Sequence, residues 1–245
     1  MTRNCLIGYT GFVGEHLASQ STFSAVFNSA NISEIARQEF DTLVCAAAPG
    51  SMFESNKFPD QDQAKIEALI DELSKVRTGR FILISSIAVL EDFASGDDEG
   101  TTHFQNELAY GRHRRALEAF VEETFEDSLV ARLPALFGQG LRKNFIFDLL
   151  NPIPTMLNEA KLESLSVVLD RPLFEQLARF YAPDPATGIL KLDRAALGAH
   201  PARAALDEAV IAHGFSATQF HNPETTYQYY NMDRLWKDID VALQA

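Results

Sequence analysis

The sequence predicts an α/β protein in which a doubly wound parallel sheet is followed by a small, irregular C-terminal lobe. Three observations lead to this prediction. Strand-like and helix-like segments alternate as far as residue 140, which is typical of a parallel sheet covered by helices. The strand candidates are apolar on both faces, as expected for buried parallel strands. After Gly140 the alternation stops, and seven of the ten prolines fall in the rest of the chain.

The first 140 residues supply the sheet and its covering helices. The apolar run at 5–7 ends in a glycine-rich turn, and the segment after that turn is compatible with a helix. Apolar residues recur at helical spacing from Ile66 to Val76. We therefore expect strands over 5–7, 25–27, 41–48, 80–86 and 129–133, and helices over 12–20, 60–76 and 106–125.

The remainder of the chain is expected to be less regular. We divide the chain into a first domain over 1–140 and a lobe over 141–245, which together form one compact unit. Prolines break 141–225 into short pieces, and 226–243 is expected to be a helix. Four aromatic residues are expected to pack that helix onto the core, with a homodimer contact as the alternative: Tyr227, Tyr229, Tyr230 and Trp236.

Composition and charge exclude several classes of function. The chain has 21 Lys and Arg against 34 Asp and Glu, a net charge of −13, which argues against binding to nucleic acids or anionic membranes. No apolar run approaches the roughly 20 residues of a membrane span, and the N-terminus does not read as a signal peptide. Cys5 and Cys45 each lie in an apolar run, as in a reduced, cytoplasmic protein. The scattered histidines indicate no metal site.

The strongest motif is the glycine pattern of Gly8-Tyr-Thr-Gly11-Phe-Val-Gly14. It follows a strand and opens a helix, and this context gives a glycine pattern its meaning. Gly8 permits the tight turn, Gly11 lets the backbone approach a pyrophosphate, and Gly14 lets the helix and strand pack closely. Free N–H groups at the start of the helix favour the diphosphate charge. The motif predicts dinucleotide binding, and a tight turn without a ligand is the alternative.

The end of the second strand bears on the choice of cofactor. An NAD site usually has an acidic residue there, on the ribose 2′-hydroxyl. Here Asn28 and Ser29 follow the strand instead, so no carboxylate repels a 2′-phosphate, and no arginine follows immediately to bind it. We expect both NAD and NADP to bind, with a weak preference for NADP. Asn31 and Ile32 are the candidates for the adenine edge.

The chain with this glycine motif resembles the extended short-chain dehydrogenase/reductases, which have a Rossmann-like fold. Within that family it is similar to the NAD-dependent epimerase/dehydratase type, which acts on nucleotide sugars. Four further segments agree in order: 43–48 (LVCAAA), 82–89 (ILISSIAV), 109–118 (AYGRHRRALE) and 132–138 (RLPALFG). The resemblance covers about residues 4–150 well. It implies a nicotinamide cofactor held by Gly8, Thr10, Gly11, Phe12, Val13, Gly14, Ala46, Ala47, Ala48, Tyr110, Arg114, Pro134 and Leu136.

The types and spacing of a few residues also predict acid–base chemistry. Tyr110 and Arg114 are four residues apart and share one face of a helix. A tyrosine is a weak base at neutral pH, and a cation one turn away favours its phenolate. A hydroxyl such as that of Ser86 can bind the reacting substrate oxygen. The resemblance makes Tyr110 the general acid/base, Ser86 the orienting hydroxyl and Arg114 the third catalytic residue, accompanying hydride transfer to or from nicotinamide.

Departures from the family pattern narrow the range of reactions expected for this chain. The family expects lysine where Arg114 stands, and these two cations are not interchangeable. Family dehydratases carry Asp-Glu where this chain has Ile87 and Ala88, which cannot transfer protons, so dehydration is not favoured. Ala135 stands where many relatives have asparagine. Beyond the sheet, the expected contacts to the nucleotide sugar, with Ser86, are Lys143, Asn144 and Phe145.

Two hypotheses of different class remain open. The first is an NAD(P)-dependent oxidoreductase or epimerase that acts on a nucleotide-activated sugar, and the pair of Ser86 and Tyr110 favours it. The second is a cofactor-binding protein of the same fold without turnover, with a regulatory or structural role. Arg114 and Ala135 favour the second hypothesis.

Overall fold

The computed structural model describes residues 3–92, 96–185 and 187–244, and these form two compact units. The first unit comprises the chain up to Gly140 together with the segment from Tyr227 onward. The second unit is Leu141–Thr226. The division after Gly140 lies where the sequence pattern changes, but the C-terminal segment belongs to the first unit, which differs from the prediction of a single compact unit with a lobe over 141–245.

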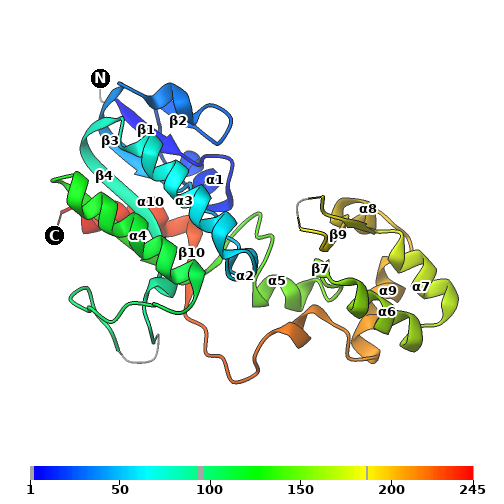
Figure 1. Cartoon of the computed structure of the whole chain (residues 1–245). Helices are drawn as coiled ribbons and strands as arrows, with labels where there is room; N and C mark the ends of the chain where they lie inside the picture. Colours follow the sequence, from blue (N-terminus) through cyan, green and yellow to red (C-terminus); the bar gives the residue numbers. More distant parts are fainter. Residues whose placement is uncertain (1–2, 93–95, 186, 245) are drawn as a thin grey trace. The chain divides into compact units, whose positions relative to one another are not determined.

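The first unit is built on a five-stranded, fully parallel sheet (Figure 1). The strands lie in the order β2-β1-β3-β4-β5, so the order reverses between β1 and β3. Their bounds are Asn4–Ile7 for β1, Ala25–Phe27 for β2, Glu39–Cys45 for β3, Arg77–Ser86 for β4 and Ser128–Leu133 for β5. The predicted Rossmann-like, doubly wound class is confirmed.

Helices cover both faces of this sheet because side chains alternate along each strand. On β1, Cys5 and Ile7 belong to one core cluster and Leu6 to another. The first cluster is completed by α3 (Pro59–Leu73) and α4 (Ala109–Thr124). The second is completed by α1 (Phe12–Gln20) and α10 (Leu235–Ala242). Both faces of the central strands are therefore shielded from water, which explains why these strands are apolar throughout.

The turn between β1 and α1 requires two of its glycines for steric reasons. Gly8 has a φ of +88°, and a Cβ there would lie 2.5 Å from the carbonyl oxygen of Ala46 at the end of β3. A Cβ on Gly14 would overlap the carbonyl oxygen of Gly8. At Gly11, in contrast, the nearest atom to a Cβ would be that same oxygen at 3.4 Å, an ordinary contact.

This difference gives a stability prediction. We expect Gly14→Ala to lower the free energy of unfolding by about 1–3 kcal/mol, the usual cost of overpacking, although alanine by itself favours a helix. Gly11→Ala is the matched control and should change stability by less than about 0.5 kcal/mol, since its Cβ has room. Urea denaturation of both variants measures this, and equal stabilities would show that helix and strand do not pack closely at Gly14.

The C-terminal segment contains more than the single helix expected over 226–243. It has a short strand, β10 (Tyr229–Asn231), a 3₁₀ turn and then α10. Strand β10 pairs in parallel with β6 (Ala135–Phe137), and paired residues are 94 positions apart in the chain. Such long-range pairing leaves no local signal in the sequence. Trp236 packs edge-on against Phe23, and Tyr230 and Trp236 pack against the core cluster that contains Leu235 and Ile239, so these two of the four aromatic residues hold the helix on the core.

The second unit is more regular than the sequence indicated. It contains an antiparallel three-stranded sheet in the order β7-β9-β8, with bounds Met156–Leu157, Leu190–Leu192 and Tyr181–Pro183. Its helices are α5 (Phe145–Leu150), α6 (Glu159–Val168), α7 (Arg171–Ala178), α8 (Arg194–Gly198) and α9 (Arg203–Ala212). Their apolar residues form a separate core, which includes Leu165, Leu177 and Leu206.

Candidate functional site

The site predicted from the sequence lies at the carboxyl ends of the parallel strands. In open α/β sheets a ligand binds where the strand order reverses, which here is between β1 and β3. The glycine turn follows β1, Ala46–Ala48 follow β3, and Ser86 ends β4. Strand pairing holds these strand ends together, with Ile7 opposite Cys45 and Cys45 opposite Leu83.

The glycine turn has the shape that a pyrophosphate requires. Gly11 is the N-cap of α1, and its N–H donates to the carbonyl of Gly8 at 3.0 Å, which closes the turn. Thr10 and Gly11 are exposed, and Phe12 and Val13 are half-buried in the first turn of the helix. Because Gly11 has no side chain, nothing on it stands between the first N–H groups of α1 and an anion. The residues present therefore fit a dinucleotide phosphate.

The loop after β2 is held by its own asparagines. The Asn31 side chain accepts from the N–H of Asn28 at 2.8 Å, and the Asn28 side chain accepts from the N–H of Ala30 at 2.9 Å. The Asn28 amide also donates to the hydroxyl of Tyr9 in the glycine turn, at 3.4 Å. Ser29 is exposed, and Ile32 begins a 3₁₀ turn. The loop thus carries amides and a hydroxyl but no charge at the end of β2.

The structure brings Ser86 and Tyr110 to neighbouring segments. Ser86 caps the 3₁₀ turn at Ile87–Val89, and its hydroxyl oxygen accepts from the N–H of Ala88 at 3.2 Å. Tyr110 lies in the first turn of α4, beside Gly111, where a Cβ would overlap the carbonyl oxygen of Ala88. Ala88 and Gly111 are thus in direct contact. Both candidate side chains are half-buried next to that contact.

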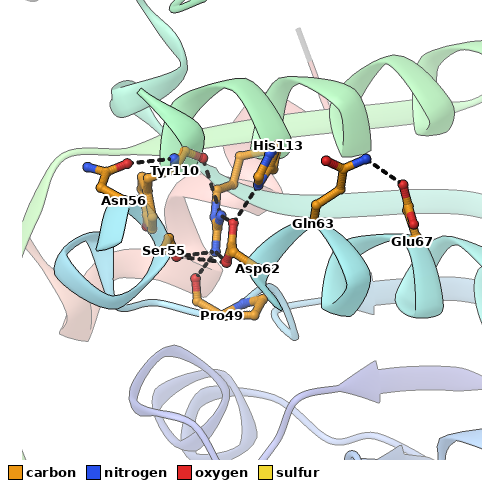
Figure 2. Close-up of polar contacts among 9 residues, drawn as sticks. Pro49, Ser55, Asn56, Asp62, Gln63, Glu67, Tyr110 and His113 are labelled. Carbon is orange, nitrogen blue, oxygen red and sulfur yellow. Dashed lines mark hydrogen bonds and ion pairs between the residues drawn. The ribbon is translucent and has the colours of Figure 1, made fainter. Parts of the chain in front are cut away.

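Tyr110 is held from α2 (Met52–Lys57) as well as by its own helix. Its backbone N–H donates to the side-chain oxygen of Asn56 at 2.9 Å, as Figure 2 shows. The guanidinium carbon of Arg114 lies 4.0 Å from the centre of the Tyr110 ring, within the range of a cation–π contact. The expected one-turn pairing of Tyr110 and Arg114 is therefore present, with the cation on the face of the ring.

Arg114 is almost completely buried, with 2% of its surface exposed, and an acidic residue binds it. Its Nη1 and Nη2 donate to the two carboxylate oxygens of Asp62 at 2.5 and 3.0 Å. Nη1 also donates to the carbonyl oxygen of Tyr110 at 3.3 Å, and Nη2 donates to that of Pro49. The resemblance assigns Arg114 to the cofactor, but both of its Nη groups donate to acceptors within the protein.

Asp62, on α3, accepts three kinds of donor in this cluster (Figure 2). Besides Arg114, the Ser55 hydroxyl donates to its Oδ1 at 2.7 Å, and His113 Nδ1 lies 2.8 Å from its Oδ2. Burial acts to raise the pKa of Asp62, but the hydrogen bonds from Arg114, Ser55 and His113 outweigh it and hold this pKa below its usual value. Asp62 is therefore a carboxylate at neutral pH.

This lowered pKa predicts an acid-sensitive contribution to stability. A carboxyl group with a lower pKa in the folded state contributes stability above its unfolded pKa, about 3.9, and loses it as the pH falls through the folded value. We expect the wild-type free energy of unfolding to fall below about pH 4, and to fall less steeply in Asp62→Asn, which lacks that titration. Urea denaturation from pH 7 to pH 3 measures both slopes, and identical slopes would contradict the assignment.

Sequence reasoning missed Asp62, Ser55 and Asn56. All three come from the segment after β3, which was expected only to supply a helix. One signal could have indicated Asp62: a buried arginine in place of lysine requires a partner of opposite charge. Neither the spacing nor the composition of the segment distinguishes Asp62 from its exposed neighbour Asp60.

The remaining predicted residues lie in two different places. Pro134 follows β5, and Leu136 lies in β6, which pairs with β10 through Ala135 opposite Tyr229. The three substrate candidates belong to the second unit. Asn144 has a φ of 116° and caps α5 by accepting from the N–H of Phe147 at 3.1 Å, Lys143 is exposed, and Phe145 packs edge-on against His221.

Comparison with known proteins supports the fold. No protein-family model matches the chain, and no curated protein matches it. Among solved structures, MoeE5 in complex with UDP-glucose and NAD is 15% identical, covers 69% of this chain and 73% of its own, and has a TM-score of 0.50. A dTDP-4-dehydrorhamnose reductase from Bacillus anthracis in complex with NADP is 18% identical, covers 59% of this chain and 57% of its own, and has a TM-score of 0.48.

A third similar structure, of RMD from Pseudomonas aeruginosa complexed with NADPH, is 18% identical over 69% of this chain and 64% of its own, with a TM-score of 0.48. This chain spans little more than half the length of the dTDP-4-dehydrorhamnose reductase. At these identities the likeness shows the fold alone, which MoeE5 shares at a TM-score of 0.50.

Two further features of the described residues concern metal ions and membranes. Across residues 3–92, 96–185 and 187–244, no three His, Cys, Asp or Glu side chains gather as a metal site would require. Within the same ranges, no helix is both long enough and apolar enough to cross a bilayer.

Proposed function

We propose that the chain is an NAD(P)-dependent oxidoreductase or epimerase that acts on a nucleotide-activated sugar. The observation that carries this proposal is the Gly8–Gly14 turn, which lies at the point where the strand order reverses and is open at Gly11. That geometry suits a pyrophosphate on the N-terminus of α1. The fold shared with MoeE5, which was solved with UDP-glucose and NAD, supports the substrate class.

The residues around the turn would hold the dinucleotide. The N–H groups of Phe12 and Val13, in the first turn of α1, suit the pyrophosphate. Ala46–Ala48 lie beside the turn because Gly8 packs against Ala46. Asn28, Ser29, Asn31 and Ile32 would face the adenosine end. When bound, a nicotinamide cofactor supplies the acceptor or donor of hydride.

The proton chemistry is assigned to the chain's own side chains. The Tyr110 hydroxyl would give a proton to, or take one from, the reacting oxygen of the sugar. The Ser86 hydroxyl, fixed by its capping bond to Ala88, would orient that oxygen. The next residues, Ile87 and Ala88, have no group that transfers protons, so this proposal does not include dehydration.

The second candidate is a dinucleotide-binding protein without turnover, and one observation favours it. Arg114 directs both Nη groups toward Asp62 and backbone carbonyls rather than toward a ligand. The two candidates agree on the cofactor site and differ on catalysis. A turnover assay therefore separates them.

The test has two stages. Calorimetric titration with NAD and NADP, oxidised and reduced, measures binding, and we expect both dinucleotides to bind, with NADP at least as tightly as NAD. A panel of UDP- and dTDP-sugars is then assayed for a change in cofactor absorbance or for epimerised product. Turnover of any sugar supports the enzyme, and binding without turnover on the whole panel supports the second candidate. If neither dinucleotide binds, both are wrong.

A further inference from the structure

Within residues 3–92, 96–185 and 187–244, one donor of the Arg114 guanidinium has no hydrogen-bond partner. Its two Nη groups donate to Asp62, to Tyr110 and to Pro49. Nε is buried, and it forms no hydrogen bond with any of the described residues. A buried donor from a charged group is costly to leave unpaired, so this N–H calls for an explanation.

We propose that Asp62 is a positioning residue for the candidate site: it orients Arg114 so that the guanidinium lies on the face of the Tyr110 ring and only Nε–H remains to donate to a bound dinucleotide. The proposal rests on the proposed cofactor site and deepens it. In this proposal Asp62 binds the two Nη groups of Arg114 and leaves Nε–H as the donor for the dinucleotide.

The contacts around Asp62 support this role because they fix the carboxylate itself. Ser55 reaches it from α2 and His113 from α4, so its two oxygens are held from different elements. Only 4% of Asp62 is exposed. A carboxylate held in this way accepts from Arg114 in a bidentate pair, the geometry with the most orientational specificity. The plane of the guanidinium is thus determined by Asp62.

The same contacts explain why arginine suits this position. A lysine ammonium has a single nitrogen, which cannot reach both Asp62 oxygens and the Pro49 carbonyl in the pattern that the two Nη groups make. The Nη groups of Arg114 bind within the protein, while its buried Nε–H has no hydrogen-bond partner among the described residues. Asp62 and Arg114 therefore act as one pair.

The experiment compares four full-length variants. Asp62→Asn removes the carboxylate charge at constant size, and Arg114→Gln removes the cation. The double variant Asp62→Asn/Arg114→Gln removes both buried charges, so no uncompensated charge remains and the fold is preserved even if Asp62→Asn alone does not fold. Asp60→Asn is the matched control, since Asp60 is an exposed acid in the same turn of α3.

The first readout needs no ligand. In ¹³C-tyrosine-labelled protein, the ring signals of Tyr110 are assigned by their loss in Tyr110→Phe. We expect them to shift in Asp62→Asn toward their positions in Arg114→Gln, because the cation leaves the ring face, and to stay unchanged in Asp60→Asn. If the Tyr110 signals of Asp62→Asn coincide with those of the wild type while those of Arg114→Gln shift, Asp62 does not position Arg114 and the proposal is overturned.

The second readout is the dissociation constant for NADP. We expect Asp62→Asn and the double variant to bind about tenfold more weakly, the cost of one hydrogen bond from a charged donor, while Asp60→Asn binds normally. Wild-type affinity in the double variant would overturn the role toward the dinucleotide. If the wild type binds no dinucleotide, the proposed function fails, and the Tyr110 signals still decide whether Asp62 positions Arg114.

Discussion

Tyr110→Phe is expected to lower kcat by about 10²–10⁴-fold on any nucleotide sugar that the wild-type protein turns over, which is the usual contribution of a general acid/base. The change removes only the phenol oxygen. The ring remains beneath Arg114, and the backbone N–H of residue 110 still donates to Asn56, so the start of α4 keeps its position. The loss should therefore lie in the proton transfer.

Two measurements separate this loss from a change in structure. The affinity for NADP should stay within about threefold of the wild-type value, because the glycine turn holds the diphosphate elsewhere. The unfolding midpoint in urea should also be retained. An unchanged kcat would make Tyr110 a structural residue and the proposed proton chemistry wrong.

Gly11→Val should abolish dinucleotide binding in a protein that still folds. Gly11 has extended backbone angles, φ −85° and ψ 164°, which valine adopts readily. The first contact of its Cβ would be the Gly8 oxygen at 3.4 Å, so the branched side chain must occupy the open side of the turn. That side is where the N–H groups of α1 would meet the pyrophosphate.

A graded control accompanies this variant. Gly11→Ala places only a methyl group on the open side and should weaken binding less than Gly11→Val, while Asp60→Asn on α3 should leave binding unchanged. Calorimetric titration with NADP measures the affinities, and circular dichroism measures the fold. Wild-type affinity in a folded Gly11→Val protein would exclude the turn as the pyrophosphate site.

Local patterns explain why the sheet of the first unit could be predicted from sequence. Its strands are short apolar runs, and their alternating contacts with two helical layers make both faces apolar, a signal that is readable within a few residues. The glycine turn was equally readable, because Gly8 and Gly14 have steric requirements that few other residues meet.

Non-local pairing explains what the sequence did not reveal. Asp62 lies in the first turn of α3, where an acid is ordinary because it suits the helix dipole. Its partner Arg114 is 52 residues away, and nothing in the sequence around either residue indicates that the two form a pair. The same holds for β10, which was expected to be helical: three residues become a strand only because β6 offers an edge to pair with.

The position of the second unit within the chain has a consequence for synthesis on the ribosome. Leu6, Val44 and Ile82 lie on the sheet face that α10 covers, and all three are fully buried. At about 5–20 residues per second, the segment between Gly140 and α10 takes roughly 5–20 s to translate. During that interval α1 is in place but α10 is not, so part of this apolar sheet face is uncovered, the kind of surface that chaperones bind.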